Sequence, residues 1–226
     1  MFSDLKDFIK SNLQSKVEEA GLNKYEIFGK EVEEPVSDLV EEYLNNKNIT
    51  YTAKRAKNKN DFPDLELKIN NVVYAFEHKA GETGNNANDL GTLNAYPDKI
   101  EKYQDNIYCI YIKYTKATEN NGIIINDVYF DKIYKFIGKR SGEDGILKYR
   151  KKDGNLRPKS WKDFENNKVY FNTLDEFKAA IHKTNEYRAE QLVLQHIESL
   201  NEASLKKIHS HLCEKLKLIS SGKNIK

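Results

Sequence analysis

The sequence predicts an α/β fold (α+β in some schemes), in which a mixed β-sheet is flanked by helices. Two alternating apolar runs flank Asn70-Asn71, which is typical of a β-hairpin. Residues 107–112 form a short, nearly continuous apolar run, as expected of a central strand that is buried on both faces. Apolar residues recur at helical spacing before and after these strands.

Two helices and a strand are expected before the hairpin. The first helix covers about residues 1–20, with Ser3 as its N-cap and Gly21 at its end. The second covers about residues 35–46 and has a proline at its first position, where the missing N–H costs nothing. A strand over about 49–56 then leads to the hairpin.

The hairpin sorts its side chains into two faces. If Asn70 and Asn71 form the turn, the apolar partners across it are Leu65 with Phe76, Leu67 with Tyr74 and Ile69 with Val72. The other face carries Asp64, Glu66, Glu77 and Lys79, and Asp64 lies directly opposite Glu77. Such partners have Cβ atoms about 4.5–5.5 Å apart. Two carboxylates at that distance repel each other unless a cation lies between them, although a solvated charged face is the alternative interpretation.

The elements after the hairpin continue the alternation of helices and strands. A polar loop is expected over residues 81–86, then a helix over about 89–104 that may break at its proline, and then the strand at 107–112. Residues 123–125 and 128–130 add one or two further strands. Two helices follow, over about 174–199 and 202–219.

Composition limits the kind of protein. With 226 residues, 38% of them apolar and 32% charged, the chain is expected to form one soluble domain over residues 1–226. It has no apolar run near the roughly 20 residues that span a bilayer, and no secretory signal at its start. The two cysteines, Cys109 and Cys213, suit a reducing compartment, so we expect a cytoplasmic protein.

Residues 135–162 form a basic segment, with 10 Lys or Arg against 3 Asp or Glu. Asp153-Gly154 is a strong turn signal, so a basic hairpin or extended loop is expected around it. The charge excess indicates either a solvated face or a surface that binds phosphates.

The catalytic interpretation of the hairpin rests on a short motif. Pro63-Asp64, followed thirteen residues after the aspartate by Glu77-His78-Lys79, resembles the PD-(D/E)XK signature of restriction-endonuclease-like nucleases. Strand–turn–strand is the context that this signature requires. The resemblance covers about residues 30–130 and implies the restriction-endonuclease-like core, with the basic hairpin as an insertion and the last two helices outside the core.

The resemblance also implies a metal site and a reaction. Asp64 and Glu77 would bind Mg²⁺, with the backbone carbonyl of His78 as a further ligand, while Lys79 would hold the attacking water and the phosphate. The imidazole of His78 would be structural. A third glutamate often comes from the preceding helix in this family, and Glu33 is the candidate, although a first-turn glutamate favoured by the helix dipole is the better explanation from the sequence.

Length and layout most resemble a type II restriction endonuclease, which implies double-stranded DNA as substrate, a homodimer and a palindromic site. No phosphate-binding loop is present, so a nucleotide cofactor is not expected. A two-stranded ribbon fits a DNA major groove. The expected DNA contacts are Lys148, Arg150, Lys151, Lys152, Asn155, Arg157 and Lys159. Two alternatives are a structure-specific or repair nuclease of the same fold, and a DNA-binding module without catalysis.

Overall fold

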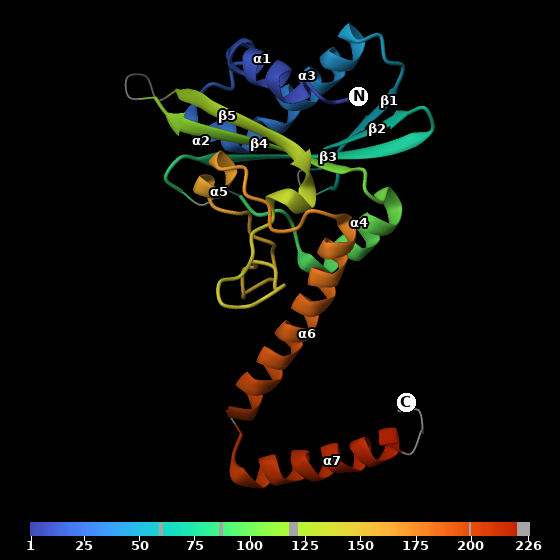
Figure 1. Cartoon of the computed structure of the whole chain (residues 1–226). Coiled ribbons are helices and arrows are strands. Elements are labelled where there is room, and N and C mark those ends of the chain that lie inside the picture. Colours follow the sequence, from blue (N-terminus) through green and yellow to red (C-terminus); the bar gives the residue numbers. More distant parts are fainter. Residues whose placement is uncertain (59–60, 86–87, 118–121, 199, 221–226) are drawn as a thin grey trace. The chain divides into compact units, whose positions relative to one another are not determined.

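A five-stranded mixed sheet, in the order β1-β2-β3-β4-β5, lies at the centre of this computed structural model (Figure 1). The structure describes residues 1–58, 61–85, 88–117, 122–198 and 200–220. Its contacts divide the chain into two compact units, Met1–Ile181 and His182–Lys226, and the sheet belongs to the first. The expectation of a single domain over residues 1–226 stays a prediction.

The predicted hairpin is present with the predicted register. Strand β2 (Leu65–Ile69) pairs antiparallel with β3 (Val72–Glu82), and Leu65, Leu67 and Ile69 lie opposite the expected partners. Asn70 and Asn71 both have positive φ, of 49° and 64°, which is the backbone that a tight two-residue turn requires. Strand β1 (Thr52–Arg55) pairs with the outer edge of β2 and is shorter than the predicted 49–56.

The remaining strands make the sheet mixed, as predicted. Strand β4 (Ile107–Lys116) is parallel to β3, and β5 (Ile123–Lys132) returns antiparallel to β4. The predicted apolar run at 107–112 is the buried first part of β4. Residues 123–125 and 128–130 belong to one strand, β5, which pairs with β4 through a single irregularity at Lys113 and Tyr114.

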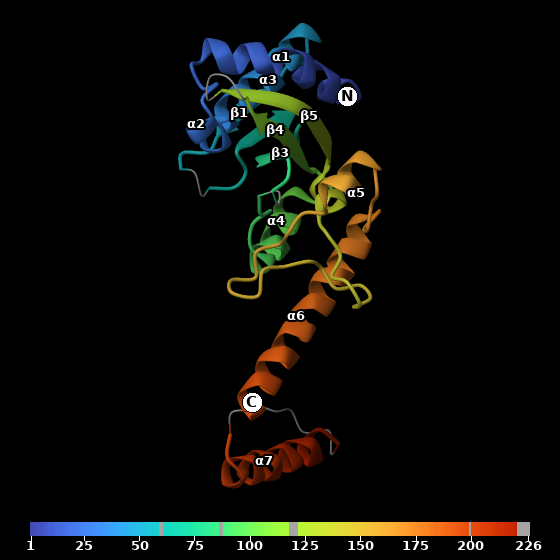
Figure 2. The same ribbon diagram turned by 90° about the vertical axis from the view of Figure 1, so that its left-hand side faces the viewer.

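Helices α1 (Leu5–Glu19), α2 (Tyr25–Glu31) and α3 (Glu33–Asn46) occupy one side of the sheet (Figures 1 and 2). Helix α1 ends at Glu19, and the predicted terminator Gly21 follows its C-cap with a positive φ of 68°. Its N-cap is Asp4 and not Ser3, whose hydroxyl instead donates to the Asp4 carboxylate. Helix α3 begins two residues before the predicted proline position. Apolar side chains of these helices pack on the apolar face of the hairpin. The core between them includes Leu5, Ile9, Leu13, Val36, Leu39 and Val40 of the helices and Leu65, Leu67 and Phe76 of the hairpin.

The opposite side of the sheet carries α4 (Tyr96–Tyr103) and α5 (Trp161–Glu165). A 3₁₀ turn, η1 (Leu93–Ala95), leads directly into α4, and a second one, η2 (Ile133–Phe136), follows β5. The predicted helix over 89–104 therefore starts late, because its proline lies at the beginning of α4 and does not interrupt it. The core on this side of the sheet includes Ala75, Tyr96, Ile100, Cys109, Tyr111, Phe136 and Phe164.

The basic segment forms a short hairpin held by isolated bridges. Tyr149 bridges Leu156, and the turn contains Gly154 at a φ of +73°. The segment is also joined to loop 88–93, because the Leu90 N–H donates to the Leu156 carbonyl (2.9 Å) and the Leu156 N–H donates to the Gly91 carbonyl (2.8 Å). The predicted basic hairpin is confirmed, and its attachment to the loop before α4 is an additional feature.

The last two helices are α6 (Leu174–Glu198) and α7 (Glu202–Ser220), close to the predicted spans; residue 199 lies outside the described residues. The first turn of α6 is capped, since the Thr173 hydroxyl accepts a hydrogen bond from the Glu176 N–H. In the second unit, Leu192, Leu212 and Leu216 are more than half exposed. None of the described helices is both long and apolar enough to cross a membrane.

Candidate active site

Asp64 and Glu77 lie side by side on the hairpin face that is turned toward α4. Asp64 directly precedes β2, and its carboxylate accepts a hydrogen bond from the backbone N–H of His78 at 2.6 Å. Glu77 lies in the middle of β3, where its backbone pairs with β4. Only 5% of Asp64 and 7% of Glu77 are exposed, so both acids are held in the protein interior.

Burial makes both carboxylates unfavourable as isolated anions. It raises the pKa of Asp64 and that of Glu77, and the charge of Asp64 raises the pKa of Glu77 further. Among the described residues, one oxygen of Glu77, Oε2, is buried without a hydrogen-bond partner. A buried polar atom of this kind is costly, so the site is suited to an additional positive group.

Lys79 supplies one positive charge to this face. Its Nζ lies 2.6 Å from Oε1 of Glu77, and 18% of its side chain is exposed. Burial alone lowers the pKa of Lys79, but the carboxylates of Glu77 and Asp64 more than reverse this, so the pKa lies above its usual range. Lys79 is therefore an ammonium ion in this arrangement, and two acids share it.

The imidazole of His78 points to the other side of the sheet, toward α3. Its Nδ1 lies 3.2 Å from the Glu33 carbonyl oxygen and 3.5 Å from the Ser37 hydroxyl. The residue is 1% exposed, and burial lowers the pKa of the ring to about 4. This placement is consistent with the expected structural role of the imidazole, and only the backbone of His78 lies near the carboxylates.

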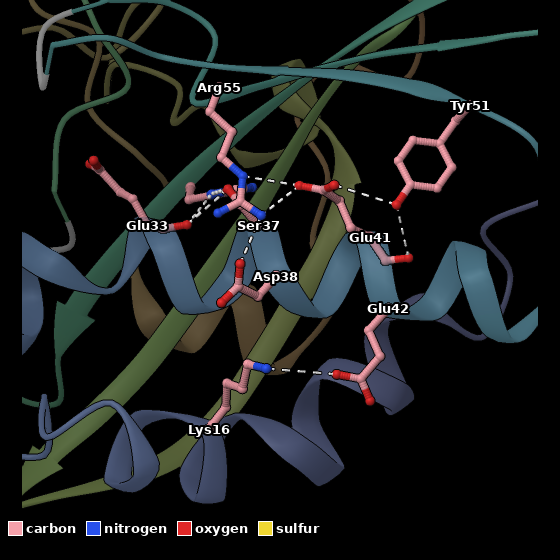
Figure 3. A network of polar contacts seen from close by, with 9 residues as sticks. Lys16, Glu33, Ser37, Asp38, Glu41, Glu42, Tyr51 and Arg55 are labelled. Atoms are coloured by element: carbon pink, nitrogen blue, oxygen red, sulfur yellow. Dashed lines mark hydrogen bonds and ion pairs between the residues drawn. The ribbon is translucent and has the colours of Figure 1, made fainter.

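Glu33 lies in the first turn of α3, beside Asp64. Both residues line one pocket of about 290 Å³. Its lining consists of Glu31, Glu33, Glu34, Ser37, Arg55, Ala56 and Asp64. Arg55 of β1 closes one side of it, because its guanidinium bonds Asp38 at 2.7 Å and Glu41 at 2.6 Å on α3 (Figure 3). These ion pairs hold α3 against β1 at the edge of the sheet. In this position the Glu33 carbonyl contacts His78.

Two arginines of the basic segment are held by an acid that lies outside it. The carboxylate of Asp89 is 2.9 Å from Arg157 and 3.2 Å from Arg150. Arg150 also bonds Asp153 within the turn, and Asn155 hydrogen-bonds the same carboxylate through its backbone N–H. These contacts fix the orientation of both guanidinium groups.

The lysines of the basic segment differ from one another. Lys151 and Lys152 are exposed at the turn, and Lys148 lines a pocket of about 530 Å³ together with Lys113, Arg157 and Trp161. Lys159 lines the same pocket but is only 6% exposed, and its ammonium donates to the Lys168 carbonyl at 2.8 Å. Lys159 is therefore less available to DNA than its position in the sequence indicated. Trp161 anchors this region, since its indole N–H donates to the carbonyls of Glu82 and Asn85.

The sequence analysis missed one cation near the carboxylates. Lys99, on α4, has its Nζ 3.6 Å from the centre of the Phe62 ring and 4.9 Å from that of Tyr96. Its charge lowers the pKa of both Asp64 and Glu77, so it belongs to the same electrostatic group. Only the lysine-rich pattern of α4 could have pointed to it, and that pattern does not distinguish Lys99 from Lys102.

The donor set fits a hard divalent cation. Within the described ranges, no three His, Cys, Asp or Glu side chains group together as ligands. Mg²⁺, however, is commonly bound through only one or two carboxylates and keeps several waters. Asp64 and Glu77 provide such a pair, and the unpartnered Oε2 of Glu77 is a ligand atom that the protein itself does not satisfy.

One family model and one solved structure are similar to this chain. A family model described as NgoBV restriction endonuclease matches residues 7–220. Among solved structures, the NlaIV restriction endonuclease is similar over 90% of this chain and 78% of its own, with 16% sequence identity and a TM-score of 0.48. A search of curated proteins gives no match.

Proposed function

Because the chain belongs to the NgoBV restriction endonuclease family, it is a type II restriction endonuclease, and we propose that it cuts DNA through the buried face of the hairpin. The observation that carries the proposal is the convergence of Asp64, Glu77 and Lys79 within one buried cluster. The spacing of the three residues is that of a PD-(D/E)XK motif, and the proposed substrate is double-stranded DNA.

The proposed cofactor is Mg²⁺, held by Asp64, by Glu77 and by the backbone carbonyl of His78. When bound, the cation would neutralise charge on the phosphate and lower the pKa of water. Glu33 lines the same pocket as Asp64, which supports the proposal that its carboxylate accepts hydrogen bonds from water at the edge of the site.

The protein's own groups orient the phosphate. Glu77 holds the ammonium group of Lys79 in place. We propose that this ammonium donates hydrogen bonds to the non-bridging oxygens of the scissile phosphate. The hydrogen bond from the His78 N–H keeps Asp64 turned toward Glu77. Because the site is buried, electrostatic interactions act there at greater strength than in water.

The proposed DNA contacts divide into two classes. Lys148, Lys151 and Lys152 would bind backbone phosphates, which adds affinity without sequence preference. Asp89 fixes the orientations of Arg150 and Arg157, so we propose that both arginines hydrogen-bond to base edges. Asn155, beside them at the turn, would contact bases as well. Lys159 is left out of this set because its ammonium is already used by the Lys168 carbonyl.

Cleavage of both strands is proposed to need two copies of the chain. One hairpin site of this kind reaches one scissile phosphate at a time, and the strands of a duplex run in opposite directions. A two-fold symmetric homodimer would place one site on each strand and would select a palindromic sequence.

The test uses purified protein, long phage DNA, and either Mg²⁺ or EDTA. Wild-type protein should give discrete fragments only with Mg²⁺, and Lys79→Ala should give none while it still binds DNA. Glu66→Gln is the matched control, since Glu66 shares the hairpin face but is already occupied by Lys102 (2.8 Å) and Tyr103 (2.6 Å). A Mg²⁺-dependent smear would contradict site-specific cleavage, and equal cleavage by Lys79→Ala would contradict the assigned site.

A further inference from the structure

Helix α4 brings a second lysine to the face of the hairpin that carries Asp64 and Glu77. The Lys99 ammonium packs against the ring of Phe62, two residues before Asp64 in the chain, at 3.6 Å from the ring centre. It also lies 4.9 Å from the ring centre of Tyr96, which is itself fully buried and hydrogen-bonded to the Leu90 carbonyl at 2.6 Å. Cation–π contacts hold an ammonium in place and leave its N–H groups available to an anion.

The pairing of Lys99 differs from that of the next lysine on the same helix. Lys102 is one turn away and forms an ion pair with Glu66 at 2.8 Å. Lys99 makes its contacts with the two rings, and no described carboxylate forms an ion pair with it. Its charge nevertheless lowers the pKa of Asp64 and Glu77, so it is near both acids without being neutralised by either.

The loop before α4 leaves room beside this ammonium. Gly91 has a φ of +86°, and a Cβ built on it would lie 3.3 Å from Nζ of Lys99. Any side chain at this position would therefore crowd the ammonium, as well as strain the backbone. The glycine lets the loop backbone pass close to Lys99 without a side chain that presses on the ammonium.

The cluster brings two acids, Asp64 and Glu77, together with two lysines, Lys79 and Lys99. Burial opposes the charge on these groups, because it raises the pKa of both acids and lowers that of Lys99. A phosphodiester brings one negative charge, and its hydrolysis passes through a state with more charge on the non-bridging oxygens. Lys79 shares its ammonium between Glu77 and the phosphate, so a second ammonium would add N–H donors to the non-bridging oxygens.

We propose that Lys99 is a second catalytic lysine, whose ammonium binds a non-bridging oxygen of the phosphate that is cleaved. This inference rests on the proposed function, because it assumes that the scissile phosphate enters beside Asp64 and Glu77. Lys79 and Lys99, from β3 and α4, then contact the phosphate from two elements.

The experiment compares Lys99→Met with Lys102→Met, which removes a neighbouring lysine of the same helix. Methionine keeps most of the apolar stem that packs on Phe62 and Tyr96. Single-turnover cleavage is measured with Mg²⁺ on a duplex that carries the site mapped from the wild-type fragments. Affinity for the same duplex is measured in EDTA over a series of salt concentrations, and the melting temperature is recorded for each variant.

Lys99→Met should cleave about 10²-fold more slowly than wild type, in the range found when a single transition-state donor is removed. Its salt dependence of binding should fall by about one phosphate contact. Lys102→Met should stay within about twofold in rate. If Lys99→Met does not fold, Lys99→Gln replaces it, with the same expectations.

Two results would overturn the inference while the proposed function stands: an active wild type with Lys99→Met unchanged in rate, or a slow Lys99→Met with an unchanged salt dependence. The second result would mean that Lys99 supports the site without touching phosphate. Absence of any Mg²⁺-dependent cleavage by wild type would instead be the failure of the proposed function.

Discussion

The hairpin face and the basic segment hold their charges under opposite conditions. On the hairpin face, Asp64 and Glu77 are almost entirely buried, and one oxygen of Glu77 has no described partner. In the basic segment most charged groups are exposed to water or form ion pairs with acids. Arg150 and Arg157, for example, both form ion pairs with Asp89. The hairpin face therefore has a small number of charges, and these are poorly compensated. The basic segment has many charges, and most of these are compensated.

This difference separates two contributions to DNA cleavage. A buried and incompletely compensated charge cluster stores electrostatic interaction that a substrate and a cation can use, which is what transition-state stabilisation requires. Exposed charges are screened, so they contribute to affinity and steering more than to rate. Mutations in the two regions should therefore change different observables.

The largest effect is expected from Asp64→Asn. Cleavage should fall by about 10²–10³-fold or more, because the proposed metal ligand and its charge are lost. Thermal stability should rise by about 1 kcal/mol, since the amide oxygen can still accept the His78 N–H while the repulsion between two buried carboxylates disappears. Fragment yield and thermal unfolding without metal measure the two effects. A less stable Asp64→Asn would show that the carboxylates are already compensated, and would remove the basis of the comparison.

The next effect is expected from Asp89→Ala, which frees Arg150 and Arg157 together. Affinity for random duplex should increase, because two charges become available to phosphates. Discrimination between the recognition site and random DNA should fall by about 1–3 kcal/mol, since the arginines lose their fixed direction. Asp153→Ala is the control, because it contacts Arg150 but forms no ion pair with Arg157. Unchanged discrimination in Asp89→Ala would exclude the two arginines from base contacts.

A smaller effect is expected from the double variant Lys151→Ala/Lys152→Ala. Both side chains are exposed at the turn. Affinity should fall equally for specific and random DNA, with a salt dependence reduced by about two phosphate contacts, and the cleavage rate at saturating enzyme should stay within about twofold. A large loss of single-turnover rate at saturation would contradict the separation of affinity from rate.

The smallest effect on DNA binding is expected from Lys159→Met. Burial lowers the pKa of Lys159 to about 8, below the ordinary 10.5, so the unfolded chain binds more protons between these values. Wild-type stability should therefore rise relative to Lys159→Met as the pH increases from 8 to about 10, by about 1 kcal/mol after solvent screening is allowed for. Urea unfolding at pH 7 and pH 10 measures this. A clear loss of DNA affinity in Lys159→Met would return this lysine to the DNA-contact set.

The hairpin was predictable because local rules determine it. The Asn70-Asn71 turn and the two-residue alternation together specify the register, and a slip of one residue would turn Leu65 and Leu67 to the wrong face. The same register brings Asp64 next to Glu77 before any tertiary contact is considered. Helix α2 was missed because its 7 residues are too few for a helical period to be recognised.

Other features depend on contacts between distant parts of the chain. Lys99 reaches the carboxylates only because α4 packs under the sheet, and its sequence neighbours carry no mark of that placement. The charge count over residues 135–162 overestimated the available cations because Asp89 lies outside that window and neutralises two arginines. The burial of Lys159 could not be predicted for a similar reason: the Lys168 carbonyl that binds its ammonium belongs to the turn after α5.

Loop 88–93 has a bearing on how such an enzyme could be redesigned. Its backbone bonds to Leu156 in the basic segment, while its last residues continue into η1 and α4. A transplant of residues 135–162 from a relative with a different target would leave these bonds, and the Asp89 contacts, mismatched. The basic segment and loop 88–93 therefore form a single exchangeable cassette, and chimeras that carry both pieces should retain cleavage where chimeras with the segment alone lose it.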